Sequence, residues 1–203
     1  MPILRRASIV LALGLALSPV AFAQSVDQAL EQARALEAES KFAEIIAVLS
    51  AHRESARPEV DHALASAYLN RQLRGASDAT AADDYAQALR LANRAAGKDH
   101  GPSLYLLSMI HDNGWGVPVD PAKSRVFLER AAKAGDVVAR ADYAVMLYQG
   151  RLGLPRDVAT ACALFAEVLV KEEIGMVASY YLGLATARGE CGLAPDMPRA
   201  LVL

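Results

Sequence analysis

The sequence predicts an all-α protein, built as an α/α solenoid of helix-turn-helix repeats. The first observation is periodicity, because anchoring aspartates at positions 84, 120, 157 and 196 follow one another at intervals of 36, 37 and 39 residues. A fixed period in this range is typical of solenoids, in which no unit buries its apolar face alone. The second observation is composition, because the chain is rich in Ala, Leu, Arg and Glu and has almost no β-branched runs, which favours helices throughout.

The N-terminal residues 1–23 have the layout of a secretory signal peptide. Arg5 and Arg6 precede an apolar run over residues 9–17, and an Ala-Phe-Ala segment supplies a small-x-small site that ends at Ala23. We expect cleavage at about Ala23 and a periplasmic or secreted mature chain, with an uncleaved anchor as the alternative. The apolar run is too short to span a bilayer, so we expect no membrane span in the mature chain.

The mature chain is mildly acidic and has no signature of nucleic-acid binding. The full sequence holds 21 Lys and Arg against 23 Asp and Glu, so removal of Arg5 and Arg6 leaves a net charge of about −4. No Lys/Arg cluster or row of interleaved aromatic residues follows, which argues against a nucleic-acid partner.

Residues 24–57 are predicted to form a helical hairpin. Apolar residues recur at three- and four-residue spacing over residues 25–36 and again over residues 41–52, as amphipathic helices require. Ser40 is the expected N-cap of the second helix, and Pro58 marks the exit from the hairpin. This hairpin would cover the apolar side of the first repeat, as the terminal units of a solenoid must.

Residues 58–203 are predicted to hold four repeat copies, at about 61–99, 100–137, 138–175 and 176–203. The copies share small residues in a first helix, a glycine turn, an aspartate and an apolar second helix. In the clearest copy these positions are Leu107, Ser108, Gly114, Gly116, Val117, Asp120, Ser124, Phe127, Ala131, Ala132 and Gly135. The last copy stops at Leu203, where the bulky residue of its second helix belongs. We therefore expect a truncated product or an apolar end completed by another chain, which predicts self-association there.

The turn residues of each copy are expected to serve architecture. Glycines take positive φ without strain, so they suit the end of the first helix. Asp120, Asp157 and Asp196 follow the turns and are expected to accept backbone N–H bonds at the start of the second helix.

The helix crossing of each copy is predicted from residue size. Small residues at Ser124, Ala161 and Ala200 are expected where the two helices meet, and the bulky Phe127 and Leu164 one turn further on the buried side. A packing role for these residues leaves little reason to assign them a function.

This pattern resembles the Sel-one-like repeat (SLR) family, relatives of the tetratricopeptide repeats, over roughly residues 60–203. Departures are His111 where the family has tyrosine, a loop longer by one residue in copies three and four, Val168-Leu169 in place of two alanines, and the single Gly75 in copy one. The resemblance implies a right-handed solenoid behind a tetratricopeptide-like hairpin. It also implies adaptor, signalling or envelope-assembly roles.

No residue pattern supports catalysis, a metal site or a cofactor. His52, His62, His100 and His111 are scattered without the spacing of metal ligands. No nucleophile elbow, phosphate loop, dinucleotide fingerprint or paired-carboxylate signature occurs in the mature chain. We therefore predict that the protein is not an enzyme and carries neither metal nor cofactor.

Cys162 and Cys191 are the only thiols, and two outcomes are open for them. An even pair in an oxidising compartment favours a disulfide, and stacking would place both residues at the same end of the solenoid. Two free thiols are the alternative, because Cα atoms more than about 7 Å apart cannot be bridged without backbone movement. Secreted members of the family staple repeats with disulfides, at positions that do not match these two.

The first helices carry the predicted binding surface, because in this superfamily they line the concave face. Mapping the copies gives a stripe of aromatic and aliphatic residues with a polar rim, which is the composition of a peptide-binding surface. The positions are Tyr105, Met109, Asp112, Asn113, Val145, Tyr148, Gln149, Tyr180, Leu184 and Arg188, with His62, Ala65, Leu69 and Ala141 beside them. The alternative is that the tyrosines pack between neighbouring repeats.

Trp115 is a further candidate contact. It sits in a turn between two glycines, where burial is hard to arrange, and an exposed tryptophan suggests an interface. The alternative is that the indole folds back over its own repeat.

Together these observations predict a non-catalytic scaffold or adaptor of the bacterial envelope, which binds an envelope protein or peptide on its concave helix face. One rival is a cell-wall-acting enzyme with β-lactamase-like activity, as ascribed to cysteine-rich secreted members of the family. The chain lacks their paired cysteine in every repeat, which disfavours that function. Another rival is a structural subunit of a polysaccharide export apparatus.

Overall fold

The computed structural model describes residues 25–75, 78–169 and 175–192. Over these residues the chain is helical and contains no strand. The helices are α1 (Val26–Ala38), α2 (Phe42–Ser50), the short 3₁₀ helix η1 (Arg53–Ser55), α3 (Pro58–Leu73), α4 (Asp78–Ala96), α5 (Gly101–Asn113), α6 (Pro121–Lys133), α7 (Val137–Gln149), α8 (Val158–Val168) and α9 (Gly175–Ala187). The all-α repeat solenoid predicted from the sequence period is confirmed.

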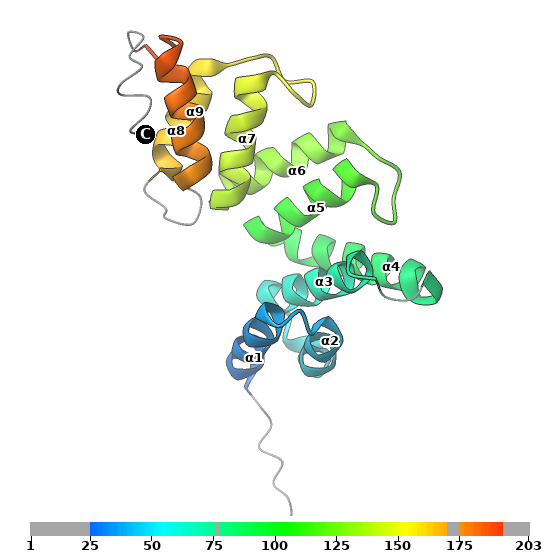
Figure 1. The fold of residues 1–203 in the computed structure, drawn as a ribbon. Helices are drawn as coiled ribbons and strands as arrows, with labels where there is room; N and C mark the ends of the chain where they lie inside the picture. Colours follow the sequence, from blue (N-terminus) through cyan, green and yellow to red (C-terminus); the bar gives the residue numbers. More distant parts are fainter. Residues whose placement is uncertain (1–24, 76–77, 170–174, 193–203) are drawn as a thin grey trace, which may run out of the picture.

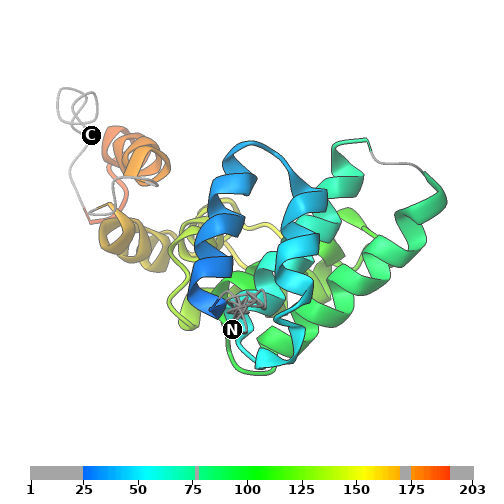
Figure 2. The ribbon, with the colours of Figure 1, turned by 90° about the horizontal axis from the view of Figure 1, so that it is seen from below.

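The helices stack as antiparallel pairs along one direction. Each helix packs against the next in the chain, and the first helices of successive pairs (α1, α3, α5, α7 and α9) also contact one another. Figure 1 shows the stack from α1/α2 at one end to α8/α9 at the other. Seen from below, α8 and α9 lie to one side of the α1–α4 end, so the stack turns along its length (Figure 2). Within the described residues, no helix has the length and apolarity needed to cross a membrane.

The N-terminal hairpin begins with a capping box. Ser25 Oγ accepts from Gln28 N at 3.2 Å, and Gln28 Oε1 accepts from Ser25 N at 3.0 Å. The predicted cap at Ser40 is wrong, because Ser40 has a left-handed φ of 58° and belongs to the end of α1. There Lys41 N donates to Leu36 O, and Ser40 N donates to Glu37 O, both at 2.9 Å, as in a Schellman motif.

The α3/α4 pair departs from the other repeats because it lacks the long glycine turn. α4 starts at Asp78, so Asp84, which stands at the repeat position of the capping Asp120, lies inside a helix. Its carboxylate is only 1% exposed. Arg71 of α3 donates to it from Nε at 2.8 Å and from Nη2, and the Gln72 amide donates to it as well.

A second buried carboxylate ties the same two helices together. Asp61 of α3 is 1% exposed and accepts from Nε of Arg94 in α4 at 2.6 Å, and from Nη2 of the same guanidinium. Nη2 of Arg94 also donates to the Arg53 carbonyl at 3.0 Å. Because burying a carboxylate without partners is expensive, these contacts fix how α3 and α4 pack.

The turns and caps of the next two pairs follow the predicted pattern. Gly114 and Gly150 end α5 and α7 in the left-handed region, with φ of 73° and 68°. Asp120 Oδ1 accepts from Lys123 N, and Asp157 Oδ1 accepts from Thr160 N, both at 3.0 Å. The expected capping role of Asp120 and Asp157 is therefore confirmed, whereas Asp196 lies outside the described residues.

The helix crossings are predicted correctly for the small residues and only in part for the bulky ones, which pack against the core without being fully buried. Ser124 and Ala161 are buried, and the hydroxyls of Ser108 and Ser124 lie 3.1 Å apart across the α5/α6 contact. Ala200 lies outside the described residues. Phe127 and Leu164 are only partly buried. The residues that point into the core come one position later: Leu128 is 2% exposed and Phe165 is 0% exposed.

The second glycine of the α5–α6 turn, Gly116, lies close to a side chain of the preceding helix pair. Gly116 has a φ of 71°, and a Cβ at this position would overlap the Cβ of Tyr85 on α4. Only glycine therefore satisfies both the left-handed backbone and the close approach of the tyrosine. The turn of one pair is fitted to the N-terminal part of the second helix of the pair before it.

Candidate functional site

The first helices enclose a groove of about 340 Å³ on their shared face. We call it the first-helix groove. It is lined from α1, α3, α5 and α7 and from the turn after α5, by Glu37, His62, Ser66, Leu69, Asn70, Leu73, Pro102, Tyr105, Leu106, Met109, Trp115, Asp136 and Val138. Of the predicted binding residues, the structure brings Tyr105 and Met109 together here, with Trp115 beside them.

Tyr105 both lines the groove and joins two repeats. Its hydroxyl donates to Asp142 Oδ2 on α7 at 2.6 Å. Burial and this hydrogen bond raise the pKa of Tyr105 above its ordinary value, so the phenol stays protonated and remains a donor. The two interpretations offered for the tyrosines, groove lining and packing between repeats, therefore both hold for Tyr105.

Trp115 packs against the core while it lines the groove. The indole is partly buried and packs against the main hydrophobic core. Its backbone N–H donates to the Ile110 carbonyl at 3.1 Å, which continues the end of α5. Trp115 therefore forms part of the groove wall and does not project from the turn.

Tyr148 is buried in the core rather than exposed on the predicted surface. Its side chain is 4% exposed, and its ring centroid lies 6.4 Å from that of Phe165 and 5.4 Å from that of Tyr181. Ala65, Leu69 and Ala141 are also buried, although Leu69 contributes to the groove wall. Sequence mapping fails at these positions because one helix face turns from solvent to core within a single residue step.

The other predicted binding residues lie outside the first-helix groove. Asp112 and Asn113 are exposed, and the Asn113 amide donates back to the Met109 carbonyl at 2.9 Å. Tyr180 is 66% exposed on α9. The remaining positions lie on α7, α9 or just beyond α9, either partly buried or exposed; they are Val145, Gln149, Leu184 and Arg188.

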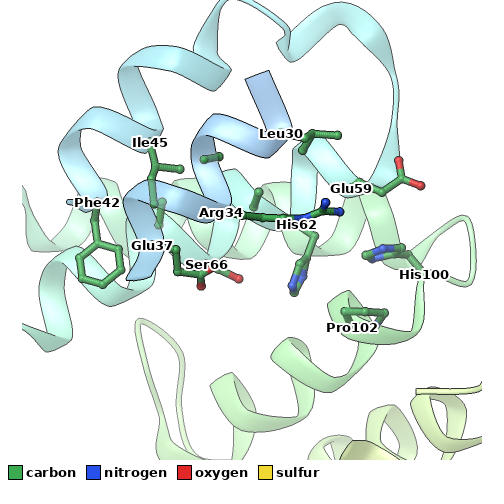
Figure 3. Close-up of a pocket in the computed structure, with 13 residues that line it drawn as sticks. Leu30, Arg34, Glu37, Phe42, Ile45, Glu59, His62, Ser66, His100 and Pro102 are labelled. Carbon is green, nitrogen blue, oxygen red and sulfur yellow. The ribbon is translucent and has the colours of Figure 1, made fainter. Parts of the chain in front are cut away.

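A second hollow, of about 220 Å³, lies where the N-terminal hairpin meets the first repeat pair. We call it the hairpin pocket (Figure 3). Apolar side chains of α1, α2 and α3 line it, among them Leu30, Phe42 and Ile45, and charged or polar groups surround them; these are Arg34, Glu37, Glu59, His62, Ser66 and His100. Sequence analysis missed this pocket, because it forms only when residues from 30 to 102 fold together.

His62 and His100 meet over Ser103 at the edge of the hairpin pocket. Ser103 Oγ lies 2.9 Å from His100 Nδ1 and 3.3 Å from His62 Nδ1, and the two ring centroids are 5.3 Å apart. Burial, together with repulsion from His100, lowers the pKa of His62 to about 4. Burial also lowers the pKa of His100. Both rings are therefore neutral near pH 7, and Ser103 is itself fully buried.

The hairpin pocket and the first-helix groove adjoin. Glu37, His62, Ser66 and Pro102 line both hollows. A single bound chain could therefore reach from the pocket into the groove without leaving the surface of the first helices.

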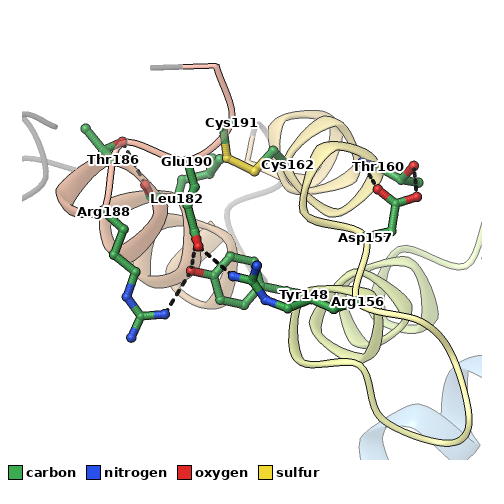
Figure 4. Close-up of a disulfide and its surroundings, with 10 residues drawn as sticks. All are labelled: Tyr148, Arg156, Asp157, Thr160, Cys162, Leu182, Thr186, Arg188, Glu190 and Cys191. Carbon is green, nitrogen blue, oxygen red and sulfur yellow. Dashed lines mark hydrogen bonds and ion pairs between the residues drawn. A yellow bond between two sulfur atoms is a disulfide. The ribbon is translucent and has the colours of Figure 1, made fainter. Parts of the chain in front are cut away.

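The C-terminal end of the described stack is held by a disulfide. Cys162 of α8 is bonded to Cys191 beyond α9, with Cα atoms 5.7 Å apart (Figure 4). Next to it Glu190 accepts from the Tyr148 hydroxyl at 2.6 Å and from Arg156 Nη2 at 2.5 Å. These bonds, that of Tyr148 first, lower the pKa of Glu190. Tyr148 and Glu190 therefore satisfy each other's hydrogen-bonding groups, so this cluster serves to hold α7 to the segment beyond α9.

The described part of the chain offers no centre for metal chemistry. Nowhere in it do three His, Cys, Asp or Glu side chains gather in a way that could hold a metal ion. What the arrangement does provide is two adjoining hollows lined by apolar side chains and acidic groups, which suits the binding of another chain.

Comparisons with known proteins agree with the repeat pattern. The Sel1 repeat family model matches residues 62–100, 101–136, 137–167 and 177–203. A Sel1 repeat protein from Oxalobacter formigenes superposes with a TM-score of 0.64 at 26% identity, over 78% of this chain and 43% of that one. A protective antigen of uropathogenic Escherichia coli with an SLR fold gives 0.62 and 26%, over 76% and 31%. The chain thus spans less than half the length of either structure. A search of curated proteins finds no match.

Proposed function

Since the chain belongs to the Sel1 repeat family, we propose that it is a non-catalytic scaffold of the bacterial envelope, which binds a protein partner along the first-helix groove. Sel1 repeats generally mediate protein–protein interaction. The observation that carries the proposal for this chain is the groove itself, which is lined by four successive first helices and adjoins a second hollow.

The composition of the groove supports a protein partner. Tyr105 and Trp115 are of the residue types that dominate binding energy at interfaces, and Met109 is of a type enriched there. Leu73 and Val138 at its sides are 44% and 43% exposed, so apolar surface is already presented to solvent. Binding a partner would remove this surface from water, at roughly 25 cal/mol per Å² before the costs of association.

The envelope location is part of the proposal. It rests on the signal-peptide layout of residues 1–23 and is supported by the close placement of the two cysteines, because disulfides persist in oxidising compartments.

Capture from an envelope extract tests the proposed function. Leu73→Glu and Val138→Glu place a charge on exposed sides of the groove, and Val126→Glu places the same charge on α6, where Val126 is 50% exposed and outside the groove. We expect each of the two groove variants to capture at least ten-fold less of the partner than wild type does, as measured by quantitative mass spectrometry. Val126→Glu should capture as wild type does. Equal loss, or no loss, in all three variants would contradict binding in the groove.

A further inference from the structure

We propose that the hairpin pocket is an anchor site for one large apolar side chain of the bound partner, and that the carboxylates around it select a lysine or arginine close to that anchor in the partner sequence. The expected ligand is thus an extended peptide segment with an aromatic or large aliphatic residue and a nearby cation. This inference rests on the proposed function, because the same segment would continue into the first-helix groove.

The size and walls of the pocket fit an apolar side chain. An apolar cavity of about 150 Å³ is enough to bind benzene, so the volume of about 220 Å³ admits a phenyl, indole or isobutyl group. The pocket is closed at its base by buried side chains, with Ile45 3% and Ala67 1% exposed. An apolar ligand group that enters it would lose its own contact with water, which favours binding.

The charges around the two hollows are unbalanced toward the negative. Glu37 and Glu59 line the pocket, and Asp136 lines the adjoining groove. Among the described residues that line either hollow, Arg34 is the one Lys or Arg, and its guanidinium donates to Glu31 at 2.9 Å. Glu59 is likewise paired, because it accepts from Arg57 Nε at 3.4 Å. Glu37 and Asp136 are therefore the acidic groups of the lining that lack a cationic partner among the described residues. A cation on the partner therefore meets attraction here, and an anion meets repulsion, which favours a basic segment.

The two histidines supply hydrogen bonding without charge. Each contacts Ser103 through Nδ1, which leaves Nε2 of each ring to donate to, or accept from, the backbone of a bound segment. Because His62 and Ser66 line both hollows, a segment anchored in the pocket would pass these groups on its way to Tyr105 and Met109.

Peptide selection tests the inference directly. A library of random 12-residue peptides would be selected on the immobilised full chain, and the enriched peptides would be synthesised for titration. We expect them to share an aromatic or large aliphatic residue with a lysine or arginine within three positions. Replacing that apolar residue by alanine should weaken binding at least ten-fold. Enriched peptides without this pattern, a peptide indifferent to that replacement, or a selection that returns no binder would overturn the inference.

Variants of the protein then locate the anchor. Ala63→Phe fills the pocket from a position that does not line the groove, and should weaken the selected peptide at least ten-fold. Ala122→Phe adds the same ring on the exposed surface of α6 and should change nothing. Glu59→Gln should weaken the peptide by two- to five-fold. If Ala63→Phe fails to fold, a photoreactive phenylalanine at the peptide's anchor position should label residues of α1, α2 or α3 in the wild-type protein.

The outcomes separate this inference from the proposed function. A peptide that is lost with Leu73→Glu but retained with Ala63→Phe, or whose photoreactive anchor labels other helices, would overturn the anchor site and leave groove binding intact. A peptide that tolerates both variants would overturn both proposals.

Discussion

The α3/α4 pair and the α7–α9 segment descend from the same repeat pattern but are held together by different chemistry. In α3/α4, Asp61 and Asp84 are each 1% exposed and are matched by arginines from the facing helix. In α7–α9, the helices are held together by the Cys162–Cys191 disulfide and by stacked aromatic rings. The ring centroids of Phe165 and Tyr181 lie 5.2 Å apart.

The difference shows that the repeat framework fixes geometry but not the source of stability. Ion pairs form in any redox environment, yet they require both charges, because the removal of one leaves the other uncompensated. A disulfide depends on an oxidising environment and is insensitive to charge. The α3/α4 pair and the α7–α9 segment should therefore lose stability under different conditions.

Loss of the disulfide should have the largest effect, confined to α7–α9. For a sequence separation of 29 residues, chain entropy alone corresponds to about 3 to 4 kcal/mol. The double variant Cys162→Ser/Cys191→Ser should lower amide protection in α8 and α9 by that free energy in hydrogen exchange, and leave α3 and α4 unchanged. Reductant should reproduce the effect in the wild type and add nothing in the variant. A uniform loss of amide protection along the whole stack would contradict the claim that the disulfide stabilises only α7–α9.

Breaking one buried ion pair should have the next largest effect, at the other end. Asp61→Ala leaves the Arg94 guanidinium without its main partner. Because the Arg94 side chain is 36% exposed, we expect a loss of about 2 to 3 kcal/mol, somewhat below the range for fully buried pairs. Urea unfolding measures it. The apolar double variant Asp61→Leu/Arg94→Met should recover much of the lost stability. A double variant as unstable as Asp61→Ala would show that the pair contributes more than the neutralisation of each buried charge by the other.

Acid should weaken the N-terminal half through His62. Its folded pKa of about 4 lies below the ordinary value of 6.5 for histidine, so the unfolded chain takes up the proton first. The stabilisation is therefore complete above pH 6.5 and is lost as the pH falls from there toward 4. By linkage this corresponds to about 2 kcal/mol between pH 7 and pH 5. The partly buried His100, whose pKa is also lowered, contributes in the same direction.

The matched variant His62→Gln should flatten this pH dependence, measured as the free energy of unfolding at pH 7 and pH 5. Asp84 does not interfere in that window. Burial alone would raise its pKa, but the hydrogen bonds from Arg71 and Gln72 lower it below the ordinary value of 3.8 for aspartate. An unchanged slope in His62→Gln would exclude His62 as the source.

The helix caps should give the smallest effects, and these should be alike for Asp120, which caps α6 between the two regions, and for Asp157, which caps α8 in the disulfide-bonded region. Asp120→Ala and Asp157→Ala each remove one side-chain acceptor from a helix N-terminus, for which about 1 kcal/mol is expected. Thermal unfolding of the two variants measures the difference between them. If Asp157→Ala were tolerated only while the disulfide is intact, the caps of α6 and α8 would differ in what their loss costs.

The sequence predicted those parts of the fold that depend on local chemistry. The turns at Gly114 and Gly150 and the caps at Asp120 and Asp157 follow from residue types at fixed spacing, so one chain with internal repeats is enough to find them. Ser40 was placed wrongly because a serine can also occupy the left-handed position after a helix. Leu128 and Phe165 were missed because a one-residue rotation changes which side of a helix faces inward.

The candidate site was less predictable because it depends on long-range contacts. Tyr105 and Met109 were found from their place in the first helix, but the burial of Tyr148 depends on Phe165 and Tyr181, which come from two other helices. The Asp61–Arg94 pair spans 33 positions, and no spacing rule links such residues in advance. The hairpin pocket likewise requires the angle between α1, α2 and α3, which no residue pattern specifies.

The fit of Gly116 against Tyr85 restricts how this protein could evolve. If each repeat were an independent module, copies could be duplicated, deleted or exchanged without regard to their order. Here the α5–α6 turn is complementary to a tyrosine of the preceding pair, so a transplanted copy would meet either a clash or a void at that junction. Substitutions at positions 85 and 116 should therefore be inherited together, and the α3–α6 segment should behave as one unit of recombination.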